Sequence, residues 1–381
     1  MKKNSLPYGK QWIDAQDIKE VAKALRSSWI TQGPTIERFE KRIAESCGVK
    51  YGIAVSSGTA ALHAAYAVAG IGDKDEIITT PLTFAATANA AVYCGATPVL
   101  ADILSDTLTI DPAAIEKKIT TRTKAIAPVD FAGHPCEYDE IIAIAKKHKI
   151  LVIEDAAHAL GSEYKKRPVG SFADMTILSF HPVKAITTGE GGMVLTNDKN
   201  LFEKLKVFRH HGVVKKPEQG PWYYEIDQPG YNYRITDLQC ALGLSQFRKL
   251  RLFIKRRREI VAMYNTAFED CEELIVPVER PYVKTAYHIY VLRLRLERLR
   301  VGRRQVFEAL QSAGIGCQVH YVPIHYHPFY QKKFGYKKGD FPVTEQYYEG
   351  AITLPLFPKM TDVEVRKVVR SVRSIIGSYR K

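Results

Sequence analysis

The feature that most constrains the fold of this 381-residue chain is an alternation of short apolar runs with helical patterns over residues 51–194. Parallel strands joined by crossover helices produce this pattern in a sequence. The runs predict strands at Gly52–Val55, Glu76–Thr80, Pro98–Asp102, Ala125–Val129, Leu151–Glu154, Met175–Phe180 and Met193–Thr196. Helical patterns fit between or after them, at Gly58–Ala69, Thr83–Tyr93, Glu137–Lys147 and Leu201–His210. We therefore expect a doubly wound, mostly parallel α/β domain.

The rest of the chain predicts a second, smaller domain. A long helical stretch runs from Thr236 to about Phe268, and strands then mix with helices, at His288–Leu294, Arg303–Ala313 and Asp362–Ile376. Since the chain is too long for one simple core, we expect a large domain over residues 1–250 and a small α/β domain over residues 251–381. An N-terminal helix, Asp14–Ser27, is expected to pack on one of them through an apolar face formed by Ile18, Val21, Ala22 and Leu25.

Composition bounds the class of protein. Hydrophobic residues make up 46% and charged residues 25%, which is ordinary for a globular chain. No stretch reaches the roughly 18 apolar residues of a membrane span, and no secretion signal precedes the first helix, so we expect a cytoplasmic protein without membrane contact. The six cysteines are far apart and form no CxxC pair, so we expect free thiols and neither disulfides nor a metal site.

The formal charge of +14 favours anionic partners. Charge alone does not decide between nucleic acid, a membrane surface and a phosphorylated small molecule. The densest basic run, Arg248–Arg258, has apolar residues at the spacing of an amphipathic helix. We interpret it as a solvated helix face rather than as a binding site.

Three loops after predicted strands carry polar residues where ligands of α/β sheets bind, at the carboxyl ends of strands. The first, Ser56–Ala60, opens a helix whose N–H groups and dipole can hold a phosphate, although an ordinary N-cap has the same appearance. The second, Glu154–His158, begins with two carboxylates that point to opposite faces, so only one of Glu154 and Asp155 can face a given site. Considered alone, Asp155 fits equally well as a cap of the next turn.

The third loop, Ser179–Lys184, precedes a glycine-rich return, Thr187–Gly192. A merely solvated lysine needs no such flexible, close-approaching backbone. Asp155 stands 29 residues before Lys184, at the end of a preceding predicted strand. A Schiff-base lysine must lose its proton readily, and a pyridine ring withdraws electrons only if its nitrogen stays protonated beside a carboxylate. Lys184 and Asp155 match these needs and together predict a pyridoxal 5'-phosphate enzyme.

Other residues match the remaining parts of this cofactor. One face of the ring needs a flat apolar partner, and Phe84, just after the predicted strand Glu76–Thr80, is placed to stack there. A core position is the alternative for Phe84. The phosphate needs a helix N-terminus and hydroxyl groups, which could come from Ser57, Gly58, Thr59 and Ser179.

Six segments of the chain, in the same order, resemble the DegT/DnrJ/StrS family of sugar aminotransferases. They are Trp29–Gly33, Ser57–Leu62, Thr83–Asn89, Glu154–His158, Ser179–Lys184 and Gly230–Arg234. The resemblance covers nearly the whole chain. It implies a pyridoxal-phosphate-dependent transferase of fold type I, similar to aspartate aminotransferase, with a large doubly wound domain and a smaller α/β C-terminal domain.

The resemblance implies roles for the residues around the ring. Lys184 would hold the cofactor as a Schiff base and act as the general base. Asp155 would pair with the pyridine nitrogen. Phe84 would stack on the ring, and His158 would lie near its phenolic oxygen.

The resemblance also implies roles around the phosphate and the substrate. Asn232 would reach the phosphate of the neighbouring subunit's cofactor, which requires a homodimer, and Arg234 would orient the loop that carries Asn232. The phosphate itself would be bound by Ser57, Gly58, Thr59 and Ser179. The family's substrate-facing loops match segments that contain Thr31, Gln32, His320 and Tyr321, although strand-end packing explains the last two equally well.

Within the family, the chain is most similar to the branch that aminates C4 of a UDP-linked 4-keto-6-deoxy sugar in pseudaminic acid biosynthesis. Three segments carry this similarity: Gly161–Tyr164, Phe180–Thr188 and Gln318–Ile324. It implies that L-glutamate donates an amino group to UDP-2-acetamido-2,6-dideoxy-β-L-arabino-hex-4-ulose by ping-pong kinetics. The expected anionic partner is then a nucleotide sugar and not nucleic acid.

Other functions compete with this interpretation. Another nucleotide-sugar 3- or 4-aminotransferase would share all the cofactor residues. A dehydratase branch of the family replaces the lysine by histidine, whereas Lys184 is present here. A lyase or desulfurase would want a reactive cysteine near the cofactor, and no cysteine falls in the cofactor segments. A non-catalytic basic binding protein would leave Lys184 and Asp155 without a joint explanation.

Overall fold

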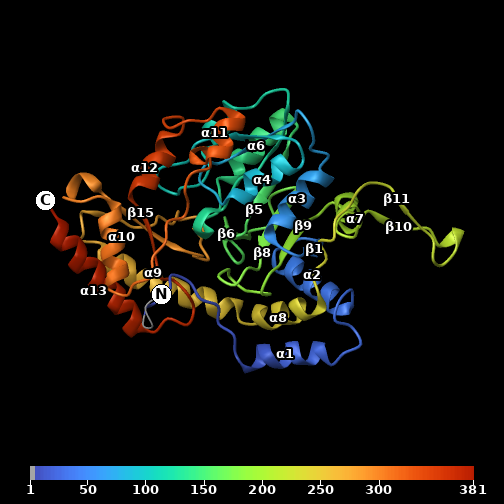
Figure 1. The fold of residues 1–381 in the computed structure, drawn as a ribbon, viewed down its shortest axis with the longest axis horizontal. Helices are drawn as coiled ribbons and strands as arrows, with labels where there is room; N and C mark the ends of the chain where they lie inside the picture. The colour runs from blue at the N-terminus through green and yellow to red at the C-terminus, as the bar shows by residue number, and fades with distance from the viewer. Residues whose placement is uncertain (1–4) are drawn as a thin grey trace.

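The computed structural model describes residues 5–381, and a seven-stranded sheet lies at its centre between helices (Figure 1). The strand order is β1-β9-β8-β5-β4-β2-β3. The strands are β1 (Tyr51–Val55), β2 (Glu76–Thr79), β3 (Thr97–Leu100), β4 (Thr123–Ile126), β5 (Leu151–Asp155), β8 (Met175–Ser179) and β9 (Gly192–Thr196). Each predicted strand is confirmed, with shifts of a few residues at its ends.

Strand β9 is antiparallel to both of its neighbours, β1 and β8, whereas the other neighbours in the sheet pair in parallel. A parallel connection usually needs a crossover of about a dozen residues that contains a helix. Residues 180–191, between β8 and β9, contain no helix, so the chain reverses through the glycine-rich return. Strands β1, β5 and β8 nevertheless run in the same direction and end at the same edge of the sheet.

Helices cover both faces of the sheet because successive strand residues point to opposite sides. In β1, Ile53 and Val55 pack in a buried cluster with α3 (Gly58–Val68), whereas Ala54 packs in another cluster with α2 (Pro34–Ser46). The other helices of this part are α1 (Ala15–Leu25), α4 (Ala85–Tyr93), α5 (Pro112–Glu116), α6 (Tyr138–His148), α7 (Lys199–Phe208) and α8 (Asp237–Phe247).

The helical stretch predicted from Thr236 to Phe268 consists of two helices, α8 and α9 (Leu250–Phe268). Thr236 starts α8 with a capping box to Gln239. At the break, Lys249 donates hydrogen bonds of 2.7 and 2.6 Å to the carboxylates of Asp14 and Asp17. The interruption therefore anchors the start of α1.

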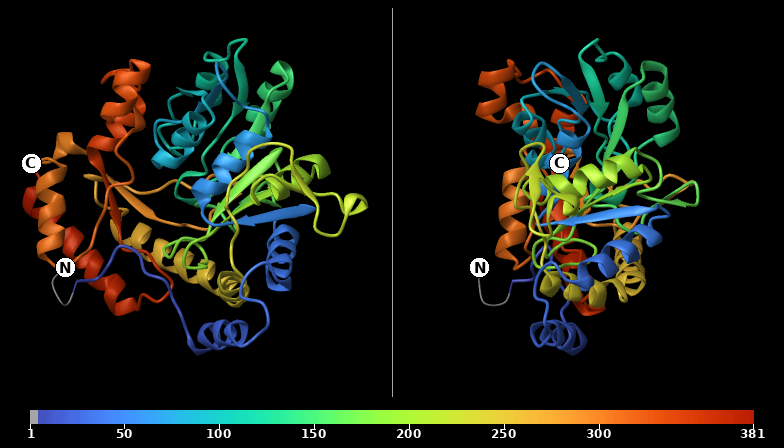
Figure 2. Two further views of the ribbon diagram at one scale, coloured as in Figure 1. Left: turned by 45° about the vertical axis from the view of Figure 1, so that its right-hand side comes forward. Right: turned by 90° about the vertical axis from the view of Figure 1, so that its right-hand side faces the viewer.

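The predicted apolar face of α1 is wrong in part. Helix α1 packs against α8 on the side away from the sheet (Figure 2), and it buries Asp17 and Ala24. Ile18 and Leu25 are 64% and 58% exposed. The reason is electrostatic, because the bonds of Asp17 to Lys249 and Gln246 turn the polar side of α1 inward.

The basic run Arg248–Arg258 is not solvated throughout, so that interpretation is wrong for Arg257. Arg257 is 3% exposed, and its guanidinium donates to the backbone carbonyls of Tyr287, His288 and Leu356. These carbonyls replace water as acceptors for a buried cation.

The C-terminal part builds a second core around a sheet of β12 (Leu274–Ile275), β14 (Tyr290–Leu294) and β15 (Ala351–Leu354). Its other helices are α10 (Arg303–Ser312), α11 (Pro328–Phe334), α12 (Pro342–Gly350) and α13 (Asp362–Tyr379). Leu6, from the N-terminal segment, joins this core and forms a backbone bridge with Ile315. The domain boundary at residue 250 stays a prediction.

Two further strand groups lie outside these sheets. β6 (Glu163–Tyr164), β7 (Arg167–Pro168) and β13 (Val283–Lys284) form a small sheet that joins the two parts of the chain. β10 (Val213–Lys215) and β11 (Tyr224–Ile226) form a hairpin that projects from the body (Figure 1). Trp222, between these two strands, is 78% exposed.

Residues 5–381 contain no grouped metal ligands and no helix that could span a membrane. All six cysteines are free thiols. Within this part of the chain, no three or more His, Cys, Asp or Glu side chains are grouped so that they could hold a metal ion. Nor does any of its helices combine the length and apolar composition needed to cross a bilayer.

Candidate active site

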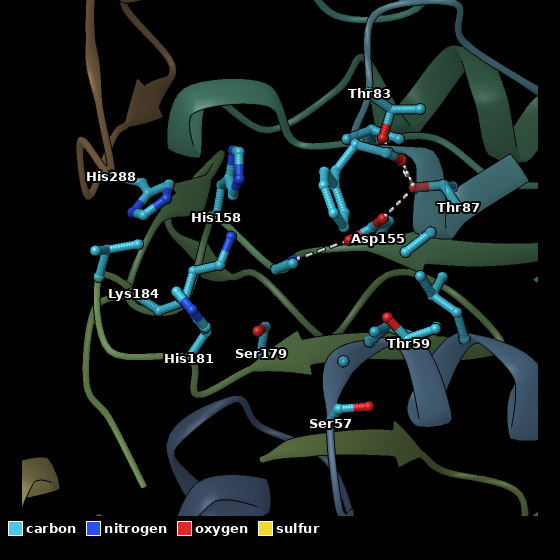
Figure 3. A pocket seen from close by; sticks show the side chains of 18 of the residues that line it. Ser57, Thr59, Thr83, Thr87, Asp155, His158, Ser179, His181, Lys184 and His288 are labelled. Atoms are coloured by element: carbon cyan, nitrogen blue, oxygen red, sulfur yellow. Dashed lines mark hydrogen bonds between the residues drawn. The ribbon is translucent and has the colours of Figure 1, made fainter. Parts of the chain in front are cut away.

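A cavity of about 340 Å³ lies where β1, β5 and β8 end, which is a size suited to a small molecule. Because these strands run in the same direction, the loops that follow them meet at one edge of the sheet. The three loops contribute Ser57, Asp155 and Lys184 (Figure 3), and the C-terminal part contributes His320 and Tyr321. The structure therefore brings together all three loops that the sequence singled out.

The first loop places the N-terminus of α3 beside the cavity. Ser57 is the N-cap of this helix, and its Oγ accepts a hydrogen bond from the N–H of Ala60 at 3.0 Å. The Ser57 hydroxyl keeps its own hydrogen for an anion, so capping and phosphate binding are compatible. Gly58 permits a close approach to β8, because a Cβ at this position would lie 3.1 Å from the Cβ of Ser179. Ser179 and Thr59 add two more hydroxyls to the lining.

The second loop holds Asp155, which is buried at the cavity end of β5. Its Oδ2 accepts a hydrogen bond from Thr87 Oγ1 at 2.7 Å, and its Oδ1 accepts one from the N–H of Ala157 at 3.1 Å. The hydroxyls of Thr83 and Thr87 are 2.8 Å apart, so a chain of two threonines ends on Asp155. Burial raises the pKa of Asp155, whereas these hydrogen bonds and the charge of Lys184 act to lower it. A cation beside Asp155 would favour its ionised form.

Glu154 points to the opposite face of the sheet, as the alternation of strand residues predicts. It is completely buried and accepts a hydrogen bond from Thr176 Oγ1. Burial raises the pKa of Glu154. Of the two adjacent carboxylates, Asp155 alone serves the cavity.

The third loop turns the side chain of Lys184 into the cavity (Figure 3). The backbone N–H of Lys184 donates to the carbonyl of His181 at 2.9 Å, which closes a turn after β8. Burial lowers the pKa of Lys184 to about 8, and the nearby Asp155 carboxylate opposes the change. At neutral pH a lysine with such a pKa holds far more of the free base than an ordinary one.

His158 is held by two hydrogen bonds that define its tautomer. The N–H of Ala132 donates to Nδ1 at 3.3 Å, so Nε2 carries the hydrogen. Nε2 lies 3.1 Å from the hydroxyl of Tyr321, which accepts this hydrogen and keeps its own for a ligand. Burial, with the charges of Lys184 and His320, holds the pKa of His158 well below its usual range. His158 is therefore a neutral donor.

Phe84 and His320 complete the part of the cavity wall that the sequence indicated. Phe84 is 60% exposed, which rules out the core position, and its ring centroid lies 5.8 Å from that of Tyr321. His320 Nδ1 lies 2.8 Å from Thr353 Oγ1. Burial and the charge of Lys184 lower the pKa of His320 to about 4.

Several cavity residues were not predicted. Thr87 follows Phe84 by three positions, so helical spacing was a usable signal for it. Glu190 lies inside the glycine-rich return that was already recognised. Tyr8 and His288 also line the cavity, but they come from the N-terminal segment and from the approach to β14. No local pattern reveals these two.

Three predicted residues lie outside the cavity that this chain forms: Thr31, Gln32 and Asn232. All three are exposed. Thr31 forms a backbone bridge with Thr236, and Asn232 forms one with His210. Their roles stay predictions, since one chain does not bring them to the site.

The model of the DegT/DnrJ/EryC1/StrS aminotransferase family matches residues 11–373. An uncharacterized protein of Methanocaldococcus jannaschii, MJ1066, is 46% identical to the chain over 100% of both. The spore coat polysaccharide biosynthesis protein SpsC of Bacillus subtilis is 45% identical over 97% of both chains. A UDP-4-amino-4,6-dideoxy-N-acetyl-beta-L-altrosamine transaminase of Campylobacter jejuni is 40% identical over 99% of both chains.

Solved structures with a similar fold are also aminotransferases. PseC of Helicobacter pylori, an aminotransferase involved in the biosynthesis of pseudoaminic acid, is 36% identical, with a TM-score of 0.93 over 98% of this chain and 100% of that one. The PLP form of the putative sugar aminotransferase Spr1654 of Streptococcus pneumoniae is 32% identical, with a TM-score of 0.93 over 98% of this chain and 99% of that one. The similarity spans the whole fold.

Proposed function

The chain belongs to the DegT/DnrJ/EryC1/StrS aminotransferase family and is a sugar aminotransferase that uses pyridoxal phosphate, and on this premise we propose its reaction. It transfers the amino group of L-glutamate to C4 of UDP-2-acetamido-2,6-dideoxy-β-L-arabino-hex-4-ulose. The product is UDP-4-amino-4,6-dideoxy-N-acetyl-β-L-altrosamine, an intermediate of pseudaminic acid biosynthesis. The end-to-end similarity to the Campylobacter jejuni transaminase of that name carries this proposal.

The side chains around the cavity fit the cofactor. The buried carboxylate of Asp155 suits a protonated ring nitrogen, and the exposed ring of Phe84 suits one face of an aromatic ring. The N-terminus of α3, with its hydroxyls, suits a phosphate. Lys184 presents an amine of lowered pKa between these groups. Pyridoxal phosphate, when bound, supplies an electron sink that makes the hydrogen on the reacting carbon acidic.

In this proposal Lys184 binds the cofactor covalently and also moves the protons. In the first half-reaction L-glutamate would displace Nζ from the cofactor, and the freed Nζ would take the proton from Cα. Water would then release 2-oxoglutarate, while the amino group would stay on the cofactor for transfer to C4 of the sugar. In the second half-reaction Nζ delivers a proton to C4 of the sugar and so sets the configuration there. A lowered pKa suits both tasks, because the amine must accept and release a proton near neutral pH.

The other cavity residues bind and orient. Asp155, supported by the Thr83–Thr87 chain, holds the ring nitrogen in its protonated form. His158 lies near the phenolic oxygen, and Tyr321, which accepts the hydrogen of His158 Nε2, keeps its own hydroxyl hydrogen for a ligand. Phe84 stacks on the ring. The phosphate is held by Ser57, Gly58, Thr59 and Ser179.

The substrate contacts are proposed on two sides of the site. His320 and Tyr321 contact the sugar from within the cavity of one chain. Thr31 and Gln32 would add contacts to the sugar nucleotide. Asn232 would reach the phosphate of a partner's cofactor, so a homodimer is part of the proposal.

A second candidate is another nucleotide-sugar 3- or 4-aminotransferase. The identity to SpsC, 45%, exceeds the 40% identity to the altrosamine transaminase, and SpsC serves spore coat polysaccharide biosynthesis. The two candidates share every cofactor residue and differ only in the sugar.

The absorbance spectrum of the purified protein, before and after L-glutamate, tests the reaction class. We expect a yellow protein whose long-wavelength band bleaches with L-glutamate, whereas Lys184→Ala does not respond. UDP-linked 4-keto sugars of both C5 configurations are then added. Recovery of the band with the L-arabino sugar alone supports the first candidate function. Recovery with another sugar supports the second candidate function instead. A colourless protein that takes up no added cofactor would contradict both.

A further inference from the structure

His288 is a buried cavity residue that none of the roles above uses. It lies two residues before the start of β14 and is 5% exposed. In the cavity it lies beside Lys184 and His158 (Figure 3). Its ring centroid is 4.3 Å from that of His158. Nδ1 of His288 is buried without a hydrogen-bond partner. Nε2 of His288 also makes no hydrogen bond to another of the described residues. Buried polar groups are rarely left unpaired, because each one costs free energy.

Backbone conformation and hydrogen bonds around His288 fix the position of its ring in the cavity. Tyr287 has φ +50° and Ala132 has φ +57°, values in the left-handed region that L side chains disfavour. The N–H of His288 donates to the carbonyl of Ala132 at 3.0 Å. The carbonyl of His288 accepts from Arg257 at 2.8 Å, and that of Tyr287 accepts at 3.3 Å. Strained backbone persists only where surrounding contacts determine it, so the position of the imidazole is built into the fold.

The other two buried imidazoles of the cavity already have protein partners. His158 accepts on Nδ1 from Ala132 and donates from Nε2 to Tyr321, so it has no acceptor left. His320 uses Nδ1 on Thr353. Of these three buried imidazoles, only that of His288 makes no hydrogen bond to another described residue from either nitrogen. Burial, followed by the charges of His158 and Lys184, holds its pKa well below the usual range, and a neutral imidazole has one acceptor nitrogen.

We propose that His288 is a positioning residue for Lys184, whose free amine donates a hydrogen bond to the His288 imidazole and is thereby held beside the reacting carbon. The inference rests on the proposed role of Lys184. A lysine stem has several rotatable bonds, so an amine that is released from the cofactor would otherwise sample many orientations. Besides Lys184 and His288, the titratable groups that line the same cavity are Tyr8, Asp155, His158, His181, Glu190, His320 and Tyr321.

The first test measures Lys184 in the protein stripped of cofactor. Acetylation of Lys184 by acetic anhydride is followed against pH by mass spectrometry in wild type, His288→Leu and His288→Gln. An acceptor stabilises the charged amine, so we expect the pKa of Lys184 to fall by about one pH unit in His288→Leu. Glutamine keeps an acceptor near the position of Nε2, so the pKa of Lys184 in His288→Gln should stay close to that in wild type. His325→Leu, which removes a fully buried imidazole outside the cavity, should not shift the profile.

The second test uses the enzyme reloaded with pyridoxal phosphate. In His288→Leu we expect kcat of the L-glutamate half-reaction to fall about tenfold with KM nearly unchanged, and His288→Gln to recover most of it. An unchanged acetylation profile in His288→Leu, or a rise of KM alone, overturns the inference. These failures leave a yellow, glutamate-responsive wild type, whereas failure of the proposed function leaves a wild type that does not respond. If His288→Leu does not fold, His288→Phe, which also lacks an acceptor, replaces it.

Discussion

The cavity and the outer surface of this chain differ in whether their side chains have partners within the same chain. In the cavity, Asp155 and His158 have hydrogen-bond partners within the same chain, Thr87 and Ala132. The outer surface, which we define as α1, residues 28–32 and the β10–β11 hairpin, instead exposes large apolar side chains: Ile18, Leu25, Trp29, Ile30, Trp222, Tyr224 and Ile226. Two predicted substrate residues, Thr31 and Gln32, lie on that surface.

The difference separates what one chain does alone from what we propose to need a second copy. The groups proposed to bind the cofactor ring and to move protons are assembled by one fold. Exposed apolar side chains in such numbers are typical of an interaction surface. This supports the proposed homodimer, in which Asn232 and the outer surface complete a neighbour's site.

The largest expected effect concerns the cavity. Replacing Lys184 by alanine removes both the covalent attachment and the proton carrier, so amino transfer should fall by at least about 10³-fold. The rate of 2-oxoglutarate formation measures this. Lys199→Ala, which removes an exposed lysine at the start of α7, is the matched control and should retain full activity. Substantial activity in Lys184→Ala would remove the basis for assigning chemistry to the cavity.

The next effect compares two adjacent carboxylates on opposite faces of β5. Asp155→Asn should lower kcat by roughly 10²-fold, because the ring nitrogen loses the anion that keeps it protonated. Glu154→Gln should leave kcat nearly unchanged and alter only thermal stability, since Glu154 lies in the core. Equal losses of kcat in the two variants would contradict the assignment of Asp155.

The proposed sharing of sites between two chains is tested by complementation. Asn232→Ala alone should lower activity about tenfold, because one hydrogen bond to the phosphate is lost. When equal amounts of Lys184→Ala and Asn232→Ala chains are unfolded and refolded together, half of the dimers are mixed and each contains one intact site. Activity should then return to about a quarter of wild type if the sites are shared across a twofold dimer. A mixture no more active than the mean of its parents would show that each site belongs to a single chain.

The smallest effect is a pH dependence of stability in the cofactor-free protein. Burial lowers the folded-state pKa of Lys184 to about 8 from 10.5, so between these values the unfolded chain binds more protons. Stability therefore rises with pH across this window, and the penalty of charging Lys184 is largest below it. Lys184→Met should raise the melting temperature by a few degrees at pH 7 and by much less near pH 10. A difference that does not change with pH would contradict a lowered pKa.

The local patterns of the sequence predicted much of the fold and part of the cavity lining. Periodicity located the strands, and the loops that follow them contain Asp155 and Lys184. The direction of β9 was not predicted, because it depends on how the helix-free return after β8 closes. The outward face of α1 was not predicted either, since it follows from the bonds of Asp17 to Lys249 and Gln246, more than 200 residues away.

By itself the sequence determined the α/β class and the strand-end loops, and it predicted Lys184 and Asp155 as the lysine and aspartate that bind the cofactor. These depend on residues close together in the chain, where the period of apolar positions and the chemistry of neighbours are visible. The tertiary structure alone decided that Tyr8 and His288 line the cavity, that Arg257 is buried, and that Thr31, Gln32 and Asn232 lie outside it. These depend on contacts between distant segments, which are formed by packing and leave no local pattern in the sequence.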